Sequence, residues 1–165
     1  MRREDVPSRT VTPMDDGGRT HSWRRRVLWA LGAIGVVFVA IQFVPYGWTR
    51  SNPPVTGAAP WPDERVAEIA RESCYSCHSN ETDWPVYSYV APMSWLVRSD
   101  VEAGRDELNF STWPRDDGEL DDAIEQIEEG EMPPSTYTLI HWGAALSDPE
   151  QAELIAALRS MDDAD

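Results

Sequence analysis

The strongest constraint on this chain is a five-residue run, Cys74-Tyr75-Ser76-Cys77-His78, which contains its only two cysteines. A Cys-x-x-Cys-His run is the pattern of a c-type haem attachment site. The two thiols can bond to the two vinyl groups of one haem, and the histidine that follows can act as the proximal ligand of the iron. The run therefore predicts covalent haem on Cys74 and Cys77, with His78 as an axial ligand.

The same run has three other interpretations. A structural zinc site has four nitrogen or sulfur ligands, whereas this run supplies three, and His21 and His141 lie far from it in the sequence. A thioredoxin-like cysteine pair is expected near a βαβ pattern, which this sequence lacks. A plain disulfide leaves His78 without a role. A thiol–disulfide protein without haem is kept as an alternative.

An apolar segment is the second constraint. Val27–Val44 comprises eighteen residues in which Gln42 is the only polar side chain, and that length meets the minimum for a transmembrane helix. A cleaved signal peptide needs small residues directly after its apolar stretch, but the first such cluster, Gly57-Ala58-Ala59, comes well downstream. The sequence therefore predicts an uncleaved transmembrane anchor over residues 27–48.

The charges around this segment predict its orientation. Arg24, Arg25 and Arg26 adjoin its N-terminal end, while only Arg50 lies close to the other end. By the positive-inside rule, the N-terminus is cytoplasmic and residues 49–165 are extracytoplasmic. Because haem c is attached outside the cytoplasmic membrane, the motif and the anchor point to the same compartment.

The same features divide the chain into four parts. They are a cytoplasmic basic tail over 1–26, the anchor over 27–48, a Pro-rich linker over 49–60 and a haem-binding domain over 61–165. The tail carries about +3 and the rest about −18 on side-chain counts. Such an acidic domain argues against a nucleic-acid partner and favours a basic redox partner protein.

The domain is predicted to be all-α, because no segment alternates apolar and polar residues as a strand does. Val66, Ile69 and Ala70 form the apolar face of a first helix leading to the motif, and Ser147 and Glu150 form a capping box for the last. Four helices are expected, over about 62–74, 94–108, 117–129 (stopped by Gly130) and from 147 onward. A large apolar cofactor would supply buried surface to so small a core.

A second axial ligand is expected from a methionine or a histidine. Met132 is followed by two prolines, which fix an extended backbone just after a predicted helix end. Met93 and His141 are the alternatives, and an open site is the remaining one. Met132 is the preferred iron ligand opposite His78.

From the motif onward the chain resembles the haem-binding domain family of small cytochrome c-like proteins. The resemblance is carried by residues 74–85, 91–97, 104–105 and 108–111, by Met132-Pro133-Pro134, by His141 and by the helix start at 146–147. It covers about residues 61–160 and implies a small cytochrome c-like helical domain around one covalent haem. It also implies His78 as the proximal ligand and Met132 as the distal one.

Together these features predict a membrane-anchored, monohaem c-type cytochrome that carries single electrons on the extracytoplasmic face. The sequence contains no serine–histidine–carboxylate set and no phosphate-binding loop, so no enzymatic activity is expected. The alternative from another class is a haem-based redox or gas sensor, which would require an open or labile distal site.

Overall fold

The computed structural model describes residues 17–114 and 118–162, and the chain separates into two compact units, Met1–Phe43 and Val44–Asp165. Within the described residues the regular structure is helical throughout, with no strand. An isolated parallel bridge joins Gly57 and Thr112. The prediction of an all-α fold is therefore confirmed for these residues.

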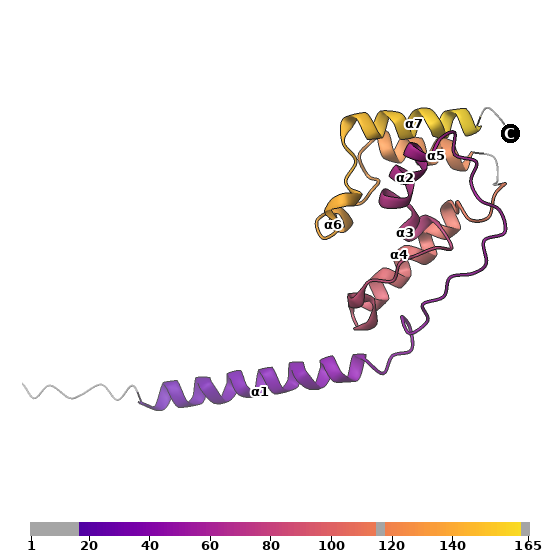
Figure 1. Ribbon diagram of the computed structural model, residues 1–165. Coiled ribbons are helices and arrows are strands. Elements are labelled where there is room, and N and C mark those ends of the chain that lie inside the picture. The colour runs from indigo at the N-terminus through magenta and orange to yellow at the C-terminus, as the bar shows by residue number, and fades with distance from the viewer. Residues whose placement is uncertain (1–16, 115–117, 163–165) are drawn as a thin grey trace, which may run out of the picture. The chain divides into compact units, whose positions relative to one another are not determined.

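The first unit contains one long helix, α1 (Gly17–Ile41) (Figure 1). Most of its large apolar side chains are exposed, among them Trp29 at 76% and Val36 at 71%. Across the described parts of the chain, no helix combines the length and the apolar character that crossing a membrane requires. Helix α1 ends at Ile41, whereas the sequence predicts a spanning helix that continues to residue 48. Residues 1–16 of the predicted tail lie outside the described residues.

The second unit holds the remaining helices, and its four longest lie close to the predicted positions. Asp63 caps the first of them by accepting a hydrogen bond from the Val66 amide at 3.0 Å, so this helix begins two residues after Pro62. The elements are α2 (Glu64–Ser73), α3 (Tyr75–His78), η1 (Val86–Tyr89), α4 (Met93–Glu107), α5 (Glu119–Glu128), α6 (Ser135–Thr138), η2 (Trp142–Ala144) and α7 (Asp148–Asp162).

The core of this unit lies among α2, α5 and α7. Helix α7 packs against both α2 and α5, and Figure 1 shows α5 (orange) beside α7 (yellow). Leu120 of α5 and Leu154 and Leu158 of α7 are 0–1% exposed. Burying each such side chain contributes roughly 1.5–3 kcal/mol to the stability of the fold. Helix α2 also contacts α3, which carries the Cys-x-x-Cys-His motif, so this core supports the motif.

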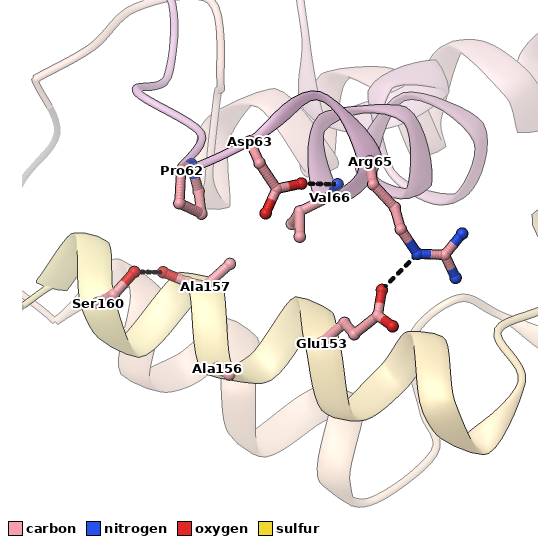
Figure 2. A pocket seen from close by; sticks show the side chains of 8 residues that line it. All are labelled: Pro62, Asp63, Arg65, Val66, Glu153, Ala156, Ala157 and Ser160. Carbon is pink, nitrogen blue, oxygen red and sulfur yellow. Dashed lines mark hydrogen bonds and ion pairs between the residues drawn. The ribbon is translucent and has the colours of Figure 1, made fainter.

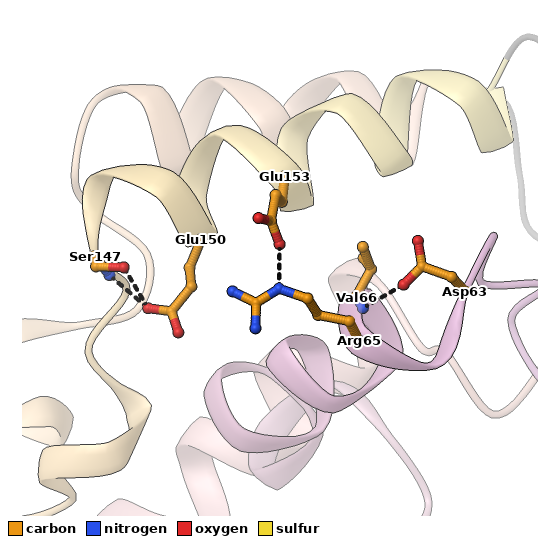
Figure 3. Close-up of polar contacts among 6 residues, drawn as sticks. All are labelled: Asp63, Arg65, Val66, Ser147, Glu150 and Glu153. Atoms are coloured by element: carbon orange, nitrogen blue, oxygen red, sulfur yellow. Dashed lines mark hydrogen bonds and ion pairs between the residues drawn. The ribbon is translucent and has the colours of Figure 1, made fainter.

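The start of α7 is fixed by the predicted capping box. The Glu150 carboxylate accepts hydrogen bonds from the Ser147 amide at 3.0 Å and from the Ser147 hydroxyl at 2.6 Å (Figure 3). Glu153, one turn further on, pairs with Arg65 of α2 at 2.8 Å. Because both side chains of this pair are largely exposed, it adds little to stability, and apolar packing holds α2 on α7.

A hollow of about 480 Å³ lies between α2 and α7 (Figure 2). It is lined by Pro62, Asp63, Arg65, Val66, Glu153, Ala156, Ala157 and Ser160. The carboxylate of Asp63 and the guanidinium of Arg65 already have partners in the helix cap and the ion pair. Its polar groups are therefore engaged in local structure.

Residues 50–59, within the linker that the sequence predicts over 49–60, run along the second unit as an extended strap. The amides of Thr56 and Gly57 both donate to the Ser111 carbonyl, at 3.0 and 3.2 Å, and the Ala59 amide donates to the Phe110 carbonyl at 3.0 Å. These backbone hydrogen bonds make the strap part of the folded unit.

Candidate functional site

The Cys-x-x-Cys-His motif forms a single helical turn at the junction of α2 and α3. Cys74 lies between the two helices, with its amide bonded to the Ala70 carbonyl at 2.8 Å. The amides of Cys77 and His78 both donate to the Cys74 carbonyl, at 3.1 and 2.9 Å. Residues three and four positions apart lie on the same face of a helix, so this turn brings Cys74, Cys77 and His78 together.

The His78 ring has one nitrogen held and one available. Its Nδ1 lies 3.1 Å from the Leu108 carbonyl oxygen, and a carbonyl can only accept, so Nδ1 carries the proton. Nε2 then keeps its lone pair, as in a metal-binding histidine whose other nitrogen is fixed by a carbonyl. Burial lowers the pKa of His78, an effect partly opposed by the backbone carbonyls of Leu108 and Gly104. Burial thus favours the neutral form of the imidazole, which is the form that can bind a metal ion.

The two cysteines are free, half-buried thiols. Burial, reinforced by the neighbouring Cys77, raises the pKa of Cys74 to about 12. Burial also raises the pKa of Cys77 to about 11, with a further increase from Asp100 and an opposing effect of Arg105. A redox-active cysteine pair has a lowered thiol pKa. The environment of these thiols therefore argues against the thiol–disulfide interpretation.

Helix α4 packs directly against the motif at Gly104, which is buried. A Cβ atom at this position would lie 2.9 Å from the Cys77 carbonyl oxygen and 3.0 Å from the Cys77 Cβ. Only glycine allows the two backbones to approach so closely. Beyond α4, the Phe110 amide donates to the His78 carbonyl at 2.9 Å, so the motif is held by this helix and the segment after it.

Arg105 braces the loop that follows the motif. It donates to the Ser79 carbonyl at 2.7 Å and to the Thr82 hydroxyl at 3.0 Å, and it reaches Ser51 and Asn52 of the strap at 3.1 Å. The Thr82 hydroxyl in turn donates to a carbonyl within the motif. The sequence did not predict this role, because it depends on segments about 25 and 50 residues away from Arg105.

The candidate second ligands differ in how their side chains are engaged. His141 has both ring nitrogens occupied, Nδ1 by the Tyr137 carbonyl at 3.1 Å and Nε2 by the Tyr87 hydroxyl at 3.0 Å. Met132 lies on the loop between α5 and α6, its amide bonded to the Gln126 carbonyl, and is 37% exposed. Met93, the first residue of α4, is 38% exposed. The geometry favours a methionine over His141.

Apolar side chains are exposed on two segments, residues 86–96 and 132–142, which are joined by hydrogen bonds beside the motif. Tyr137 is hydrogen-bonded to Ser76 within the motif at 2.7 Å, and His141 to Tyr87 of η1. The large apolar residues exposed on these segments are Val86, Tyr89, Val90, Met93, Leu96, Met132, Leu139, Ile140 and Trp142. Such side chains, together with the two thiols and the imidazole nitrogen Nε2 of His78, are the groups that a large apolar ring with a central metal needs.

Comparison with known proteins identifies the cofactor. The haem-binding domain family matches residues 36–160. The chain belongs to this family. Haem is therefore the cofactor of its folded domain, and the predicted family is confirmed. Among the described residues of this haem domain and of α1, no three His, Cys, Asp or Glu side chains form a separate metal-binding group.

One curated relative is an enzyme. The chain is 28% identical, over 142 residues, to the cytochrome c peroxidase Ccp of Escherichia coli strain K12. The match covers 77% of this chain and 30% of the relative's length. No solved structure matches the chain significantly. The expectation that the chain has no enzymatic role is overturned by this relative. That expectation relied on the absence of a catalytic side-chain set, whereas a haem brings redox chemistry of its own.

Proposed function

We propose that the haem domain binds its haem covalently, as a c-type centre, and transfers single electrons. Cys74 and Cys77 would hold the two vinyl positions, His78 would bind the iron through Nε2, and Met132 would bind it on the opposite side. When bound, haem supplies an iron that gains and loses one electron at a time. The protein would supply both iron ligands, His78 and Met132, and apolar side chains to contact the haem.

The observation that carries this proposal is the state of the His78 ring. Its Nδ1 proton is donated to the Leu108 carbonyl at 3.1 Å, so the ring cannot rotate without losing that bond, and Nε2 stays available. His141 offers no such nitrogen, because both of its nitrogens have partners. A His–Met ligand pair, which raises the reduction potential of a haem, is therefore the arrangement that these residues support best.

Replacing Met132 by alanine tests the second ligand. In the full chain matured with haem, Met132→Ala should lose the long-wavelength band that a methionine–iron(III) bond gives. Its reduced form should also bind carbon monoxide, because one axial position is vacated. Oxidised and reduced absorption spectra, with and without carbon monoxide, measure both effects.

Met93→Ala is the matched control, since the two methionines are almost equally exposed, and it should keep the wild-type spectrum. Loss of the band in Met93→Ala instead would assign the ligand to Met93. Wild-type protein that binds carbon monoxide at once would favour the sensor interpretation, and wild-type protein without haem would refute the proposal.

The similarity to a named cytochrome c peroxidase favours a second candidate, the reduction of hydrogen peroxide. Conversion of one peroxide to two waters consumes two electrons and two protons. A centre that donates one electron at a time therefore needs an external electron donor to complete each turnover. Sustained peroxide consumption by the wild-type protein with a donor, above that of free haem, would support this activity. A single oxidation without turnover would leave electron transfer alone.

We further propose that residues 27–48 attach the chain to the cytoplasmic membrane, with the haem domain on the extracytoplasmic side. Support comes from the exposed apolar side chains of α1 and from the three arginines at positions 24–26. The full chain should fractionate with membranes and resist extraction by high salt, and a chain lacking residues 1–43 should be released. Equal release of both forms would contradict the proposal.

The redox partner is proposed to be a basic protein. Glu125, Glu128, Glu129 and Glu131 are exposed just before Met132, and the chain carries a net charge of −15. Complementary charge speeds encounter and is screened by salt. Electron exchange with a basic donor should therefore slow as salt is added, and a rate independent of salt would refute this charge pairing.

A further inference from the structure

Three aromatic side chains form a connected chain of contacts beside the motif. The Tyr137 hydroxyl donates to the Ser76 hydroxyl at 2.7 Å. The Tyr137 ring stacks on His141, with centroids 4.1 Å apart and an angle of 18° between the planes. His141 Nε2 lies 3.0 Å from the Tyr87 hydroxyl. The contacts join the segment after Met132 to two other parts of the haem domain.

The donor or acceptor role of each polar atom in these contacts follows from its hydrogen-bond partner. His141 Nδ1 lies 3.1 Å from the Tyr137 carbonyl, which only accepts, so Nδ1 is the protonated nitrogen. Nε2 must then accept, and the Tyr87 hydroxyl donates to it. Burial raises the pKa of both Tyr87 and Tyr137, which keeps both hydroxyls protonated as donors. Every polar side-chain atom of Tyr87, Tyr137 and His141 therefore has a defined partner.

The contacts of Tyr137 and His141 lie close in the sequence to Met132, the proposed second iron ligand. Ser76 lies between Cys74 and Cys77, so the bond from Tyr137 ends on the motif itself. Tyr137 belongs to α6, which begins at Ser135, directly after the two prolines that follow Met132. Only the rigid Pro133-Pro134 pair and two further residues separate Met132 from this anchor point. On the other side, His141 is held by Tyr87 of η1.

We propose that Tyr87, Tyr137 and His141 are positioning residues that form a latch, holding the Met132 segment against the motif and so keeping Met132 on the iron. This inference rests on the proposed function. With the latch closed, Met132 would hold the iron and external ligands would be excluded. With the latch open, the Met132 segment moves away and a small ligand such as carbon monoxide or peroxide can bind. His141 thus acts through its neighbours rather than as a ligand.

The test removes single hydroxyl groups in the haem-loaded full chain. Tyr137→Phe keeps the stack on His141 but loses the bond to Ser76, and Tyr87→Phe loses the bond to His141. Loss of either hydrogen bond should raise about fivefold the fraction of reduced protein that binds carbon monoxide, because one hydrogen bond typically shifts an equilibrium by about this factor. The methionine–iron(III) band of the oxidised protein should weaken in parallel. Tyr46→Phe, which removes a hydroxyl that bonds Glu102 at 3.3 Å outside the latch, should behave as wild type.

A double-variant cycle separates the latch from a general loss of stability. Ser76→Ala removes the other partner of the Tyr137 bond, so it should match Tyr137→Phe, and the two changes together should add nothing further. Wild-type carbon monoxide binding in all of these variants, with the methionine band present, would overturn the latch and leave the proposed function intact. Absence of that band from the wild-type protein would overturn both.

Discussion

Replacing Cys74 and Cys77 together by serine is expected to abolish the haem that stays with the chain after denaturation. A serine hydroxyl does not form the thioether bond that a cysteine thiol forms with a haem vinyl group, so no covalent link remains. Each single replacement should keep one link and a reduced amount of bound haem. Haem staining after denaturing electrophoresis, together with the mass of the intact chain, measures the result directly.

The control for this change is the fold of the domain. Serine is nearly isosteric with cysteine, and both cysteines lie in a turn held by backbone hydrogen bonds from Cys77 and His78 to the Cys74 carbonyl. The double variant should therefore keep the helical circular dichroism of the unloaded wild-type protein. Covalent haem in the double variant, or its absence from wild-type protein in a host that matures c-type cytochromes, would contradict the assignment.

Local signals explain the parts of this fold that the sequence predicted well. The start of α7 is set by Ser147 and Glu150, which are three residues apart and need no tertiary contact to meet. Gly130, predicted to stop the third long helix, has a φ of +74° just after the end of α5. Such a left-handed position favours glycine. These features depend on neighbours in the sequence, and a single sequence contains them.

The features that the sequence did not predict are set by distant contacts. Arg105 bonds Ser79, Thr82 and the strap, a role that no pattern in the neighbouring sequence indicates. The strap itself was predicted as a spacer because of its prolines, and its pairing partner at Phe110–Ser111 lies about 50 residues further on. Neither contact leaves a periodic pattern in the sequence.

The candidate site also combines features set by neighbours in the sequence with features set by distant contacts. The positions of Cys74, Cys77 and His78 follow from a five-residue pattern, whereas the hydrogen bond that orients His78 comes from Leu108, thirty residues away. The contact between Tyr87 and His141 carried no recognisable signal, because these two residues are separated by 54 positions. A sequence can therefore name the groups that hold a cofactor more readily than the groups that orient them.

Replacing Gly104 by valine is expected to disturb the Cys-x-x-Cys-His motif from the side of α4. The nearest atoms to a Cβ at this position belong to Cys77, at 2.9 and 3.0 Å, and two of the three closest are backbone atoms, which cannot move as a flexible side chain does. Helix α4 or the motif must therefore shift. Overpacking of this kind costs about 1–3 kcal/mol. Urea unfolding of the haem-loaded protein and its ratio of haem to protein measure the two consequences.

Ala103→Val is the matched control, because it introduces the same side chain at the preceding, exposed position of α4. At an exposed helix site the change should alter the free energy of unfolding by at most about 0.5 kcal/mol and leave haem loading unchanged. Gly104→Ala gives an intermediate test, since alanine favours a helix over glycine by roughly 1 kcal/mol. A net destabilisation in that variant would mean that the contact with Cys77 outweighs helix propensity. If Gly104→Val instead matches Ala103→Val in stability and haem content, α4 does not hold the motif by direct backbone contact, and the bonds from Leu108 and Phe110 must be what positions His78.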